Sequence, residues 1–171
     1  MTSTTPSRKP AAPSAAGLFL DNQLCFALYA ASLAMTKVYR PLLAPLNLTY
    51  PQYVVMLALW QHRQLTAGAL GECVALDSGT LVPLVRKLKA LGLVERERAP
   101  GDDRSVLVSL TPAGRALQKR AHAVHDSVAC ATQCNSAQRQ TLTRGLRKLR
   151  GALLAPVSRV PPPLQRKSKA P

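Results

Sequence analysis

Four cysteines carry the most reactive side chains of this chain: Cys25, Cys73, Cys130 and Cys134. A cysteine thiolate can attack a peroxide oxygen and become a sulfenic acid, which then forms a disulfide with a second thiol. No signal peptide is recognisable in the first residues, so we expect a cytoplasmic protein whose thiols stay reduced. The four cysteines are then not a structural disulfide framework, and each needs another explanation.

The sequence around Cys25 contains no cation that would favour a thiolate. No Lys, Arg or His lies within one helical turn of it, which leaves the start of the surrounding helix as the local feature that could do so. A lone cysteine in such a setting is more often a small packed hydrophobic residue. A reactive Cys25 would therefore need groups from elsewhere in the fold or from a second subunit. Cys73, among Leu70, Val74 and Leu76, is predicted to fill the core.

Two further cysteines and two histidines fall near the end of a long predicted helix. Cys130 and Cys134 are four residues apart, so their Cβ atoms would be about 6 Å apart in an intact helix, whereas a disulfide needs about 3.8 Å. Either one could instead meet Cys25 of a partner subunit. His122 and His125 join these cysteines over about half of the helix circumference, so the four side chains cannot converge on one metal ion. A two-residue half-site completed by another subunit stays open, but we expect no metal and no cofactor.

The composition points to a nucleic-acid partner. The 171 residues contain 23 Lys and Arg against 8 Asp and Glu, a net charge of +15, and a small protein with such an excess of positive charge most often binds a polyanion. Because six cations lie in the terminal segments and all eight acids lie between Asp21 and Asp126, the central segment is basic by itself. The small number of aromatic residues argues against a stacking platform for single strands. No apolar run reaches the roughly 18 residues that span a bilayer, so no membrane contact is expected.

Boundary signals divide the chain into short elements. Residues 1–17 and 155–171 are rich in Pro, Ser, Ala or basic residues and are predicted to be disordered. Between them we expect helices over 18–40, 49–60, 66–75, 80–91, 111–133 and 137–154, a turn over 77–79, and strands over 94–98 and 106–110. Pro41 is expected to end the first helix, and Ser136 to cap the last. The order is that of a winged helix-turn-helix, a mainly α fold of the α+β type, with extra helices at both ends. The first helix is apolar nearly all the way round, which in a small protein indicates a dimer interface.

The fourth predicted helix has the residue pattern of a DNA-recognition helix. Its apolar residues form one stripe toward the core, and small or hydroxylated residues at its amino-terminal end are followed by Arg86 and Lys87. Such an end can meet base edges in a major groove while the cations meet phosphates or guanine. Arg96, Arg98 and Arg104, on or beside the predicted hairpin turn, could reach the neighbouring minor groove. Glu95 and Glu97 partly neutralise these arginines, and a solvated basic face is the alternative.

The same region resembles the MarR family of bacterial transcription regulators. The resemblance rests on Leu76-Asp77-Ser78-Gly79-Thr80-Leu81-Val82-Pro83-Leu84, Asp102-Asp103-Arg104-Ser105 and Leu110-Thr111-Pro112-Ala113-Gly114. It implies an intertwined homodimer on an inverted repeat of double-stranded DNA, with dimerisation helices over 18–40 and 111–154 and a DNA-binding lobe over about 49–110. Asp102 and Arg104 would brace the wing and place an arginine in the minor groove. The predicted DNA contacts are Ser78, Thr80, Pro83, Arg86, Lys87, Arg96, Arg98, Asp102 and Arg104.

The first helices resemble one branch of that family, the organic hydroperoxide resistance regulators. The matching segments are Asp21-Asn22-Gln23-Leu24-Cys25-Phe26-Ala27-Leu28-Tyr29, Thr36-Lys37-Val38-Tyr39-Arg40-Pro41-Leu42-Leu43 and Leu48-Thr49-Tyr50-Pro51-Gln52-Tyr53. The resemblance implies that Cys25 is the peroxide-sensing thiol and that Tyr39 and Tyr50 of the opposite subunit donate hydrogen bonds to its sulfur, which favours the thiolate. It also implies the two-cysteine type, in which Cys130 resolves the sulfenic acid, with Cys134 as the less favoured partner.

These features predict a transcriptional repressor and not an enzyme. Its reduced dimer would bind a palindromic operator, and oxidation of Cys25 by an organic hydroperoxide would release the DNA. Two alternatives stay open. A regulator of the same family could respond to a small phenolic compound, bound between the first two helices and the DNA-binding lobe. A thiol peroxidase could also use Cys25, but that activity would explain neither the helix-turn-helix nor the positive charge.

Overall fold

The computed structural model describes residues 18–99 and 102–155, without the side chains of residues 99 and 102–104. The two segments predicted to be disordered, 1–17 and 155–171, lie outside this range apart from residue 155. The described residues divide into two compact units, one that ends at Ala131 and one that begins at Thr132. The first unit holds α1 to α5 and the sheet, and the second holds α6.

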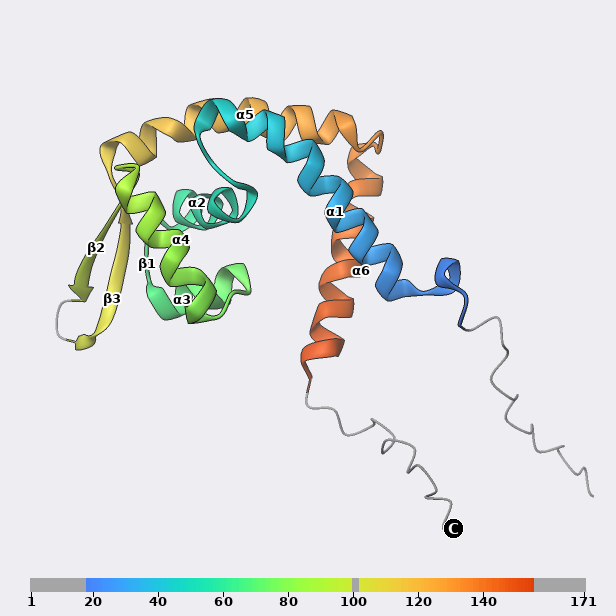
Figure 1. Ribbon diagram of the computed structural model, residues 1–171, viewed down its shortest axis with the longest axis horizontal. Coiled ribbons are helices and arrows are strands. Elements are labelled where there is room, and N and C mark those ends of the chain that lie inside the picture. Colours follow the sequence, from blue (N-terminus) through green and yellow to red (C-terminus); the bar gives the residue numbers. More distant parts are fainter. Residues whose placement is uncertain (1–17, 100–101, 156–171) are drawn as a thin grey trace, which may run out of the picture. The chain divides into compact units, whose positions relative to one another are not determined.

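Helices form most of the described chain (Figure 1). The helices are η2 Leu20–Asn22, α1 Leu24–Leu43, η3 Ala44–Leu46, α2 Tyr50–His62, α3 Ala67–Val74, α4 Ser78–Ala90, α5 Pro112–Ala131 and α6 Ser136–Leu154. The strands are β1 Gln64–Thr66, β2 Val94–Ala99 and β3 Asp102–Leu110, which form an antiparallel sheet in the order β1-β3-β2. Helices α3 and α4 followed by the β2–β3 hairpin make a winged helix-turn-helix, so the predicted fold class is confirmed.

The core of the first unit lies under α4 and the sheet. Its fully buried side chains come from α1, α2, α3, α4 and both long strands: Leu43, Val55, Met56, Leu59, Leu70, Leu88, Val94 and Val108. Side-chain caps stabilise the first turns of two helices that pack around this core. Thr66 Oγ1 accepts a hydrogen bond from the Ala69 N–H at 3.2 Å, and Thr111 Oγ1 accepts one from the Gly114 N–H at 3.0 Å. Capping residues therefore fix the starts of α3 and α5, at the residues 66 and 111 where the sequence predicted these helices to begin.

A close backbone contact joins α5 to the hairpin. A Cβ atom on Gly114 would lie 2.0 Å from the carbonyl oxygen of Leu93. The indole N–H of Trp60 in α2 donates a hydrogen bond to the carbonyl oxygen of Gly114 at 2.9 Å, and the Thr111 N–H donates one to Leu93 at 3.1 Å. Glycine at position 114 thus allows α5 to pass directly over the start of β2.

Several predicted boundaries are wrong for identifiable reasons. Helix α1 begins at Leu24 because Gln23 is extended, and it continues past Pro41 to Leu43, where the proline falls in the exposed last turn and removes only one backbone hydrogen bond. Residues 78 and 79 are not a turn, because the Asp77 cap starts α4 at Ser78. Asn135, not Ser136, caps α6, and α5 ends at Ala131.

Strand β1 was not predicted. It has three residues, too few to show an alternating pattern, and it exists because Gln64, Leu65 and Thr66 pair with Ser109, Val108 and Leu107 of β3. Within the described ranges, no single helix has the length and apolarity to cross a membrane, although two sharply bent helix pairs meet those criteria jointly.

Candidate DNA-binding surface and redox site

Helix α4 presents five of the predicted DNA contacts at the surface. Its cap, Asp77, accepts hydrogen bonds from the N–H and the hydroxyl of Thr80 at 2.9 and 3.1 Å. These hydrogen bonds, the backbone one foremost, hold the pKa of Asp77 below its ordinary value. Leu81, Val85 and Leu88 face the core. The exposed residues are Ser78, Thr80, Pro83, Arg86 and Lys87. The helix therefore combines small polar groups at its amino-terminal end with two cations about two turns later.

The arginines of β2 and its acids lie on opposite faces of the strand. Because side chains alternate along a strand, Arg96 and Arg98 share a face with buried Val94, whereas Glu95 and Glu97 are exposed on the other face. Arg96 is half-buried and Arg98 is exposed. The acids thus do not lie between the arginines on one surface, as alternation along the sequence could imply.

The remaining two predicted contacts belong to the tip of the wing. The backbone of Asp102 pairs with Ala99 beside an irregularity in the β2–β3 register. The side chains of Asp102 and Arg104 lie outside the described part of the chain, so their roles stay predictions.

Cys25 is exposed in the first turn of α1, and the two predicted tyrosines lie far from it in the same chain. Tyr39 is fourteen residues further along the same helix, which is about 21 Å at 1.5 Å per residue. The structure therefore brings the two tyrosines together but does not bring Cys25 to them within one chain.

The two tyrosines are packed against each other. The ring centroids of Tyr39 and Tyr50 are 4.6 Å apart, and those of Tyr39 and Tyr53 are 5.7 Å apart. Burial, followed by the neighbouring Tyr50 and Tyr53, raises the pKa of Tyr39 to about 12. At neutral pH the Tyr39 hydroxyl therefore keeps its proton and can act as a hydrogen-bond donor, which is the role expected of it.

The other three cysteines are also free thiols. Cys130 is exposed and lies one residue before the end of α5. Cys134 is half-buried and lies beyond that helix, after Gln133, which adopts a φ of 52°. Cys130 and Cys134 therefore do not share one intact helix, and the prediction that they do is wrong. Cys73 is exposed rather than part of the core. The buried residues of α3 are Leu70 and Gly71, and at 100° per residue Cys73 lies about 110° around the helix from the middle of that buried side.

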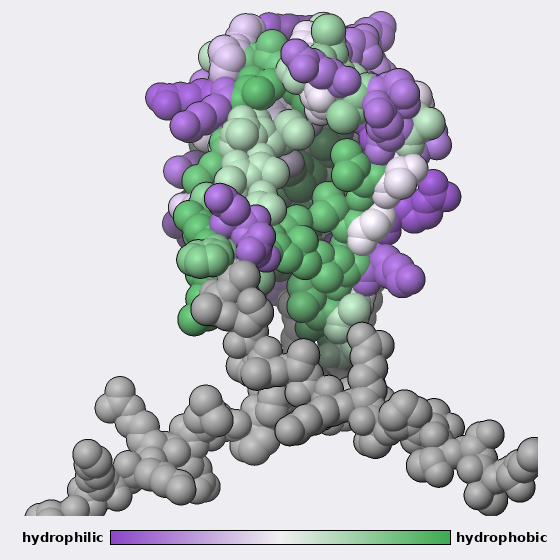
Figure 2. Space-filling view, turned by 90° about the vertical axis from the view of Figure 1, so that its right-hand side faces the viewer, coloured by the Kyte–Doolittle hydropathy of each residue, from purple (hydrophilic) through white to green (hydrophobic). Residues whose placement is uncertain are grey.

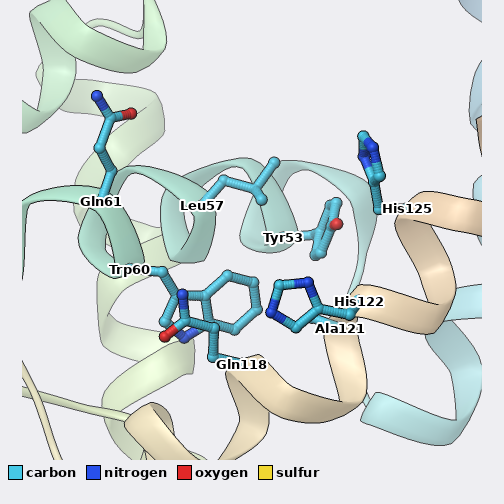
Figure 3. Close-up of a pocket in the computed structure, with 8 residues that line it drawn as sticks. All are labelled: Tyr53, Leu57, Trp60, Gln61, Gln118, Ala121, His122 and His125. Carbon is cyan, nitrogen blue, oxygen red and sulfur yellow. The ribbon is translucent and has the colours of Figure 1, made fainter.

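A pocket of about 390 Å³ opens between α2 and α5 (Figure 3). Its apolar wall includes Tyr53 and Trp60, and Gln118, His122 and His125 lie on the α5 side. The ring centroids of Tyr53 and Trp60 are 6.0 Å apart, so the pocket continues the aromatic cluster that starts at Tyr39. The sequence analysis considered the histidines only as metal ligands and did not predict this pocket. The feature that could have indicated it is a pair of aromatic residues on one side of α2 together with polar residues on one side of α5. No three His, Cys, Asp or Glu side chains in residues 18–99 and 102–155 are grouped to hold a metal ion.

Comparison with known proteins agrees with this geometry. The chain is 53% identical over 102 residues to the organic hydroperoxide resistance transcriptional regulator of Bacillus subtilis, which covers 60% of this chain and 69% of that protein. The chain belongs to the MarR family of transcriptional regulators, in its organic hydroperoxide resistance branch. This MarR-family chain also matches, over residues 37–121, the family described as transcriptional regulator SarA/Rot.

Solved structures resemble this MarR-family regulator over most of its length. Reduced AbfR bound to DNA has a TM-score of 0.65 at 31% identity, covering 80% of this chain and 96% of that one. Disulfide-formed AbfR has a TM-score of 0.56 at 33% identity, covering 76% and 91%. Bordetella bronchiseptica BpsR, whose DNA binding is regulated by 6-hydroxynicotinic acid, has a TM-score of 0.67 at 29% identity, covering 74% and 98%. The chain is thus a DNA-binding transcriptional regulator with a winged-helix fold.

Proposed function

We propose that the chain is a cytoplasmic, redox-sensing transcriptional repressor of the two-cysteine type. Its reduced homodimer binds a palindromic operator, and oxidation of Cys25 by an organic hydroperoxide releases the DNA. One observation carries this proposal: Cys25 is exposed about 21 Å along α1 from Tyr39, while the rings of Tyr39 and Tyr50 are packed together with centroids 4.6 Å apart. While α1 stays helical, these residues can form one site only if a second subunit supplies the tyrosines. The 53% identity to a hydroperoxide resistance regulator supports the same reading.

Exposed apolar side chains on α1 provide a surface for that dimer. Leu24, Tyr29 and Leu33 are 58%, 62% and 48% exposed, and Leu43 is the one buried residue of α1. Figure 2 views the molecule from the end where the amino-terminal half of α1 lies and shows large hydrophobic areas there. Apolar surface of this kind usually marks an interaction site. The predicted burial of α1 on several sides is therefore expected in the dimer.

The proposed chemistry begins at the Cys25 sulfur. Its thiolate attacks the terminal oxygen of the hydroperoxide, the O–O bond breaks, and the alkoxide takes a proton from water and leaves as an alcohol. The sulfur keeps the hydroxyl as a sulfenic acid. The thiolate of Cys130 from the other subunit then attacks this sulfur, hydroxide leaves, and an intersubunit disulfide forms. The apolar neighbours of Cys25 favour an organic hydroperoxide over hydrogen peroxide.

The disulfide would act on DNA binding through geometry. A dimer that reads an inverted repeat must hold its two α4 helices about one DNA turn, 34 Å, apart. Pulling Cys25 and Cys130 into bonding distance moves the ends of α1 and α5, and the lobes that carry α4 lose this spacing. Contacts from Arg86 and Lys87 to the DNA then fail together, so a modest movement lowers the affinity by orders of magnitude.

The first test of this function is DNA release. The full-length protein is bound to a duplex selected from a random library and treated with cumene hydroperoxide. We expect the wild type and Cys73→Ser, a matched exposed thiol, to release the duplex, and Cys25→Ser to stay bound. Tyr39→Phe should react about tenfold more slowly, because a hydrogen bond to a charged group contributes about 1.5 kcal/mol or more. Release of Cys25→Ser at the wild-type dose would refute the sensor assignment.

The second test concerns the resolving cysteine. On a non-reducing gel after hydroperoxide treatment, wild type and Cys134→Ser should give a band at twice the monomer mass, and Cys130→Ser should not. The opposite pattern would assign the disulfide to Cys134. A dimer band that persists in Cys25→Ser would show that neither pairing is the sensing reaction.

A second candidate function is control by a small aromatic ligand, which the pocket between α2 and α5 favours. Its volume of about 390 Å³, aromatic wall and polar rim suit a phenolic acid, and similarity to BpsR is in keeping with such a ligand. Release of Cys25→Ser from DNA by a phenolic compound, with no response to hydroperoxide in the wild type, would establish this function in place of redox sensing.

A further inference from the structure

Helix α6 begins a strongly basic end of the chain. No acidic residue follows Asp126, whereas nine cations do. Five of the nine lie in α6: Arg139, Arg144, Arg147, Lys148 and Arg150. Arg139 is already used locally, since its guanidinium donates a hydrogen bond to the carbonyl oxygen of Cys134. The other four side chains are exposed. Because α6 contains no acid, these cations have no opposite charge on their own helix.

The cations and the leucines of α6 occupy different sides of the helix. Leu142, Leu146, Leu149 and Leu153 are spaced four, three and four residues apart, so at 100° per residue they fall within about 60° of one another. This spacing is that of a seam that packs against another helix. Leu142, Leu146 and Leu153 are 59%, 49% and 68% exposed, so the seam has room for a partner helix.

The basic face lies opposite this seam. At 100° per residue, Arg144, Arg147 and Lys148 are about 130° to 170° away from the centre of the leucine stripe. If the leucines are buried in the proposed dimer, these three cations remain in water. They form a single-sign charged patch that has no role in the sensing chemistry and does not belong to α4 or the wing.

We infer that this basic face of α6, made by Arg144, Arg147 and Lys148, binds the phosphate backbone of DNA outside the bases read by α4. Duplex DNA presents one phosphate per 3.4 Å of each strand, and the helix rises about 6 Å over the four steps from Arg144 to Lys148, so neighbouring phosphates of one strand fall within reach. A lipid surface fits less well, because insertion needs an apolar face that stays free, and here the leucines take the role of a helix seam. DNA is also the polyanion that an operator-bound regulator meets at the highest local concentration.

The test is the salt dependence of binding to a long mixed-sequence duplex. Each lost phosphate contact lowers the slope of log Kd against log salt by about 0.9. The variant Arg144→Gln/Arg147→Gln/Lys148→Gln should therefore show a slope smaller by about 2 to 3, and Arg144→Lys/Arg147→Lys, which keeps the charge, should match wild type. The α4 variant Arg86→Gln/Lys87→Gln should lower the slope independently, so that combining both changes adds their effects.

Two outcomes would overturn the inference. One is a wild-type slope in the glutamine variant, which would leave an acidic protein surface as the partner to test. The other is an equal loss in the lysine variant, which would show that packing and not charge is responsible. The phosphates could belong to a second duplex or to flanking DNA on the same duplex. A bead-bound duplex of about 20 base pairs, long enough for two half-sites, distinguishes these two cases. Capture of a second labelled duplex by wild type but not by the glutamine variant indicates bridging, and a slope effect without capture indicates flanking DNA on the same duplex.

Discussion

The contact between α5 and the hairpin makes Gly114 the residue whose replacement should harm the fold most. In Gly114→Ala the new Cβ would start 2.0 Å from the Leu93 carbonyl oxygen, 3.1 Å from the Leu93 carbonyl carbon and 3.2 Å from a methyl group of Leu110. A carbon and an oxygen that are not bonded do not approach closer than about 3 Å, so α5 must move by about 1 Å. The Leu93 oxygen cannot retreat freely, because it accepts the Thr111 N–H at 3.1 Å.

The size of the effect follows from what this movement breaks. Overpacking of a filled site costs about 1–3 kcal/mol. The hydrogen bonds from Trp60 to Gly114 and from Thr111 to Leu93 would both lengthen, at about 1 kcal/mol each. We therefore expect a loss of about 3–5 kcal/mol in the free energy of unfolding. For a protein of this length, each kcal/mol lowers the melting temperature by about 2–4 °C, which gives a decrease of roughly 6–20 °C.

The assay is thermal unfolding followed by circular dichroism, at one protein concentration because dimerisation shifts apparent stability. The matched control is Gly145→Ala in α6, where a Cβ atom would meet nothing within 4 Å. That change should raise stability by up to about 1 kcal/mol, since alanine is the better helix former. A melting temperature for Gly114→Ala within one or two degrees of wild type would refute the packing argument.

Three further changes test other parts of the structure. Arg63 has a φ of 66° and a ψ of −43°, a strained conformation for any residue with a side chain. Arg63→Gly should therefore raise the midpoint of urea unfolding by an amount equivalent to about 1 kcal/mol. A lower midpoint would show that the arginine side chain stabilises the fold by more than the strain costs. Asp77→Ala should weaken DNA binding and lower thermal stability. It should also make stability depend less on pH in acid. The pKa of Asp77 is lower in the folded protein than its ordinary value of 3.8, so the ionised carboxylate stabilises the fold above pH 3.8, and that contribution is lost as the pH falls below this value. Between pH 10 and about 12 the wild type should lose more stability than Tyr39→Phe, because folded Tyr39 keeps its proton up to about 12 whereas the unfolded chain releases it near 10; parallel profiles for the two proteins would contradict this.

Features that depend on neighbouring residues were predictable from the sequence. The recognition helix followed from an apolar stripe at helical spacing, and the starts of α3 and α5 followed from Thr66 and Thr111, because caps act within one turn. Gly92, two residues after the end of α4, has a φ of 69°, the left-handed conformation in which helices commonly end, and this agrees with the predicted helix end at residue 91. The errors at Pro41 and at residues 77–79 were of one to three residues. The last turn of α1 accommodates Pro41 at the cost of one backbone hydrogen bond, and a cap such as Asp77 uses the same residue types as a turn.

Features that depend on distant residues were not predictable. Strand β1 exists through pairing with β3, more than forty residues away. Cys73 was assigned to the core because its neighbours are apolar, but the side of α3 that is buried is chosen by α2, α4 and β3, which pack on it. The pocket beside Trp60 likewise needs α2 and α5 to be placed next to each other.

By itself, the order of residues determined that this chain carries a basic helix-turn-helix with a wing and one cysteine near the start of its first long helix, because periodicity, capping and charge are properties of short segments. Tertiary structure alone decided which of those residues meet. It packs Tyr39 against Tyr50, leaves Cys25 and the apolar side of α1 exposed, and ends α5 before Cys134. The physical reason is that burial and contact are set by packing between segments far apart in the chain, which no local pattern records.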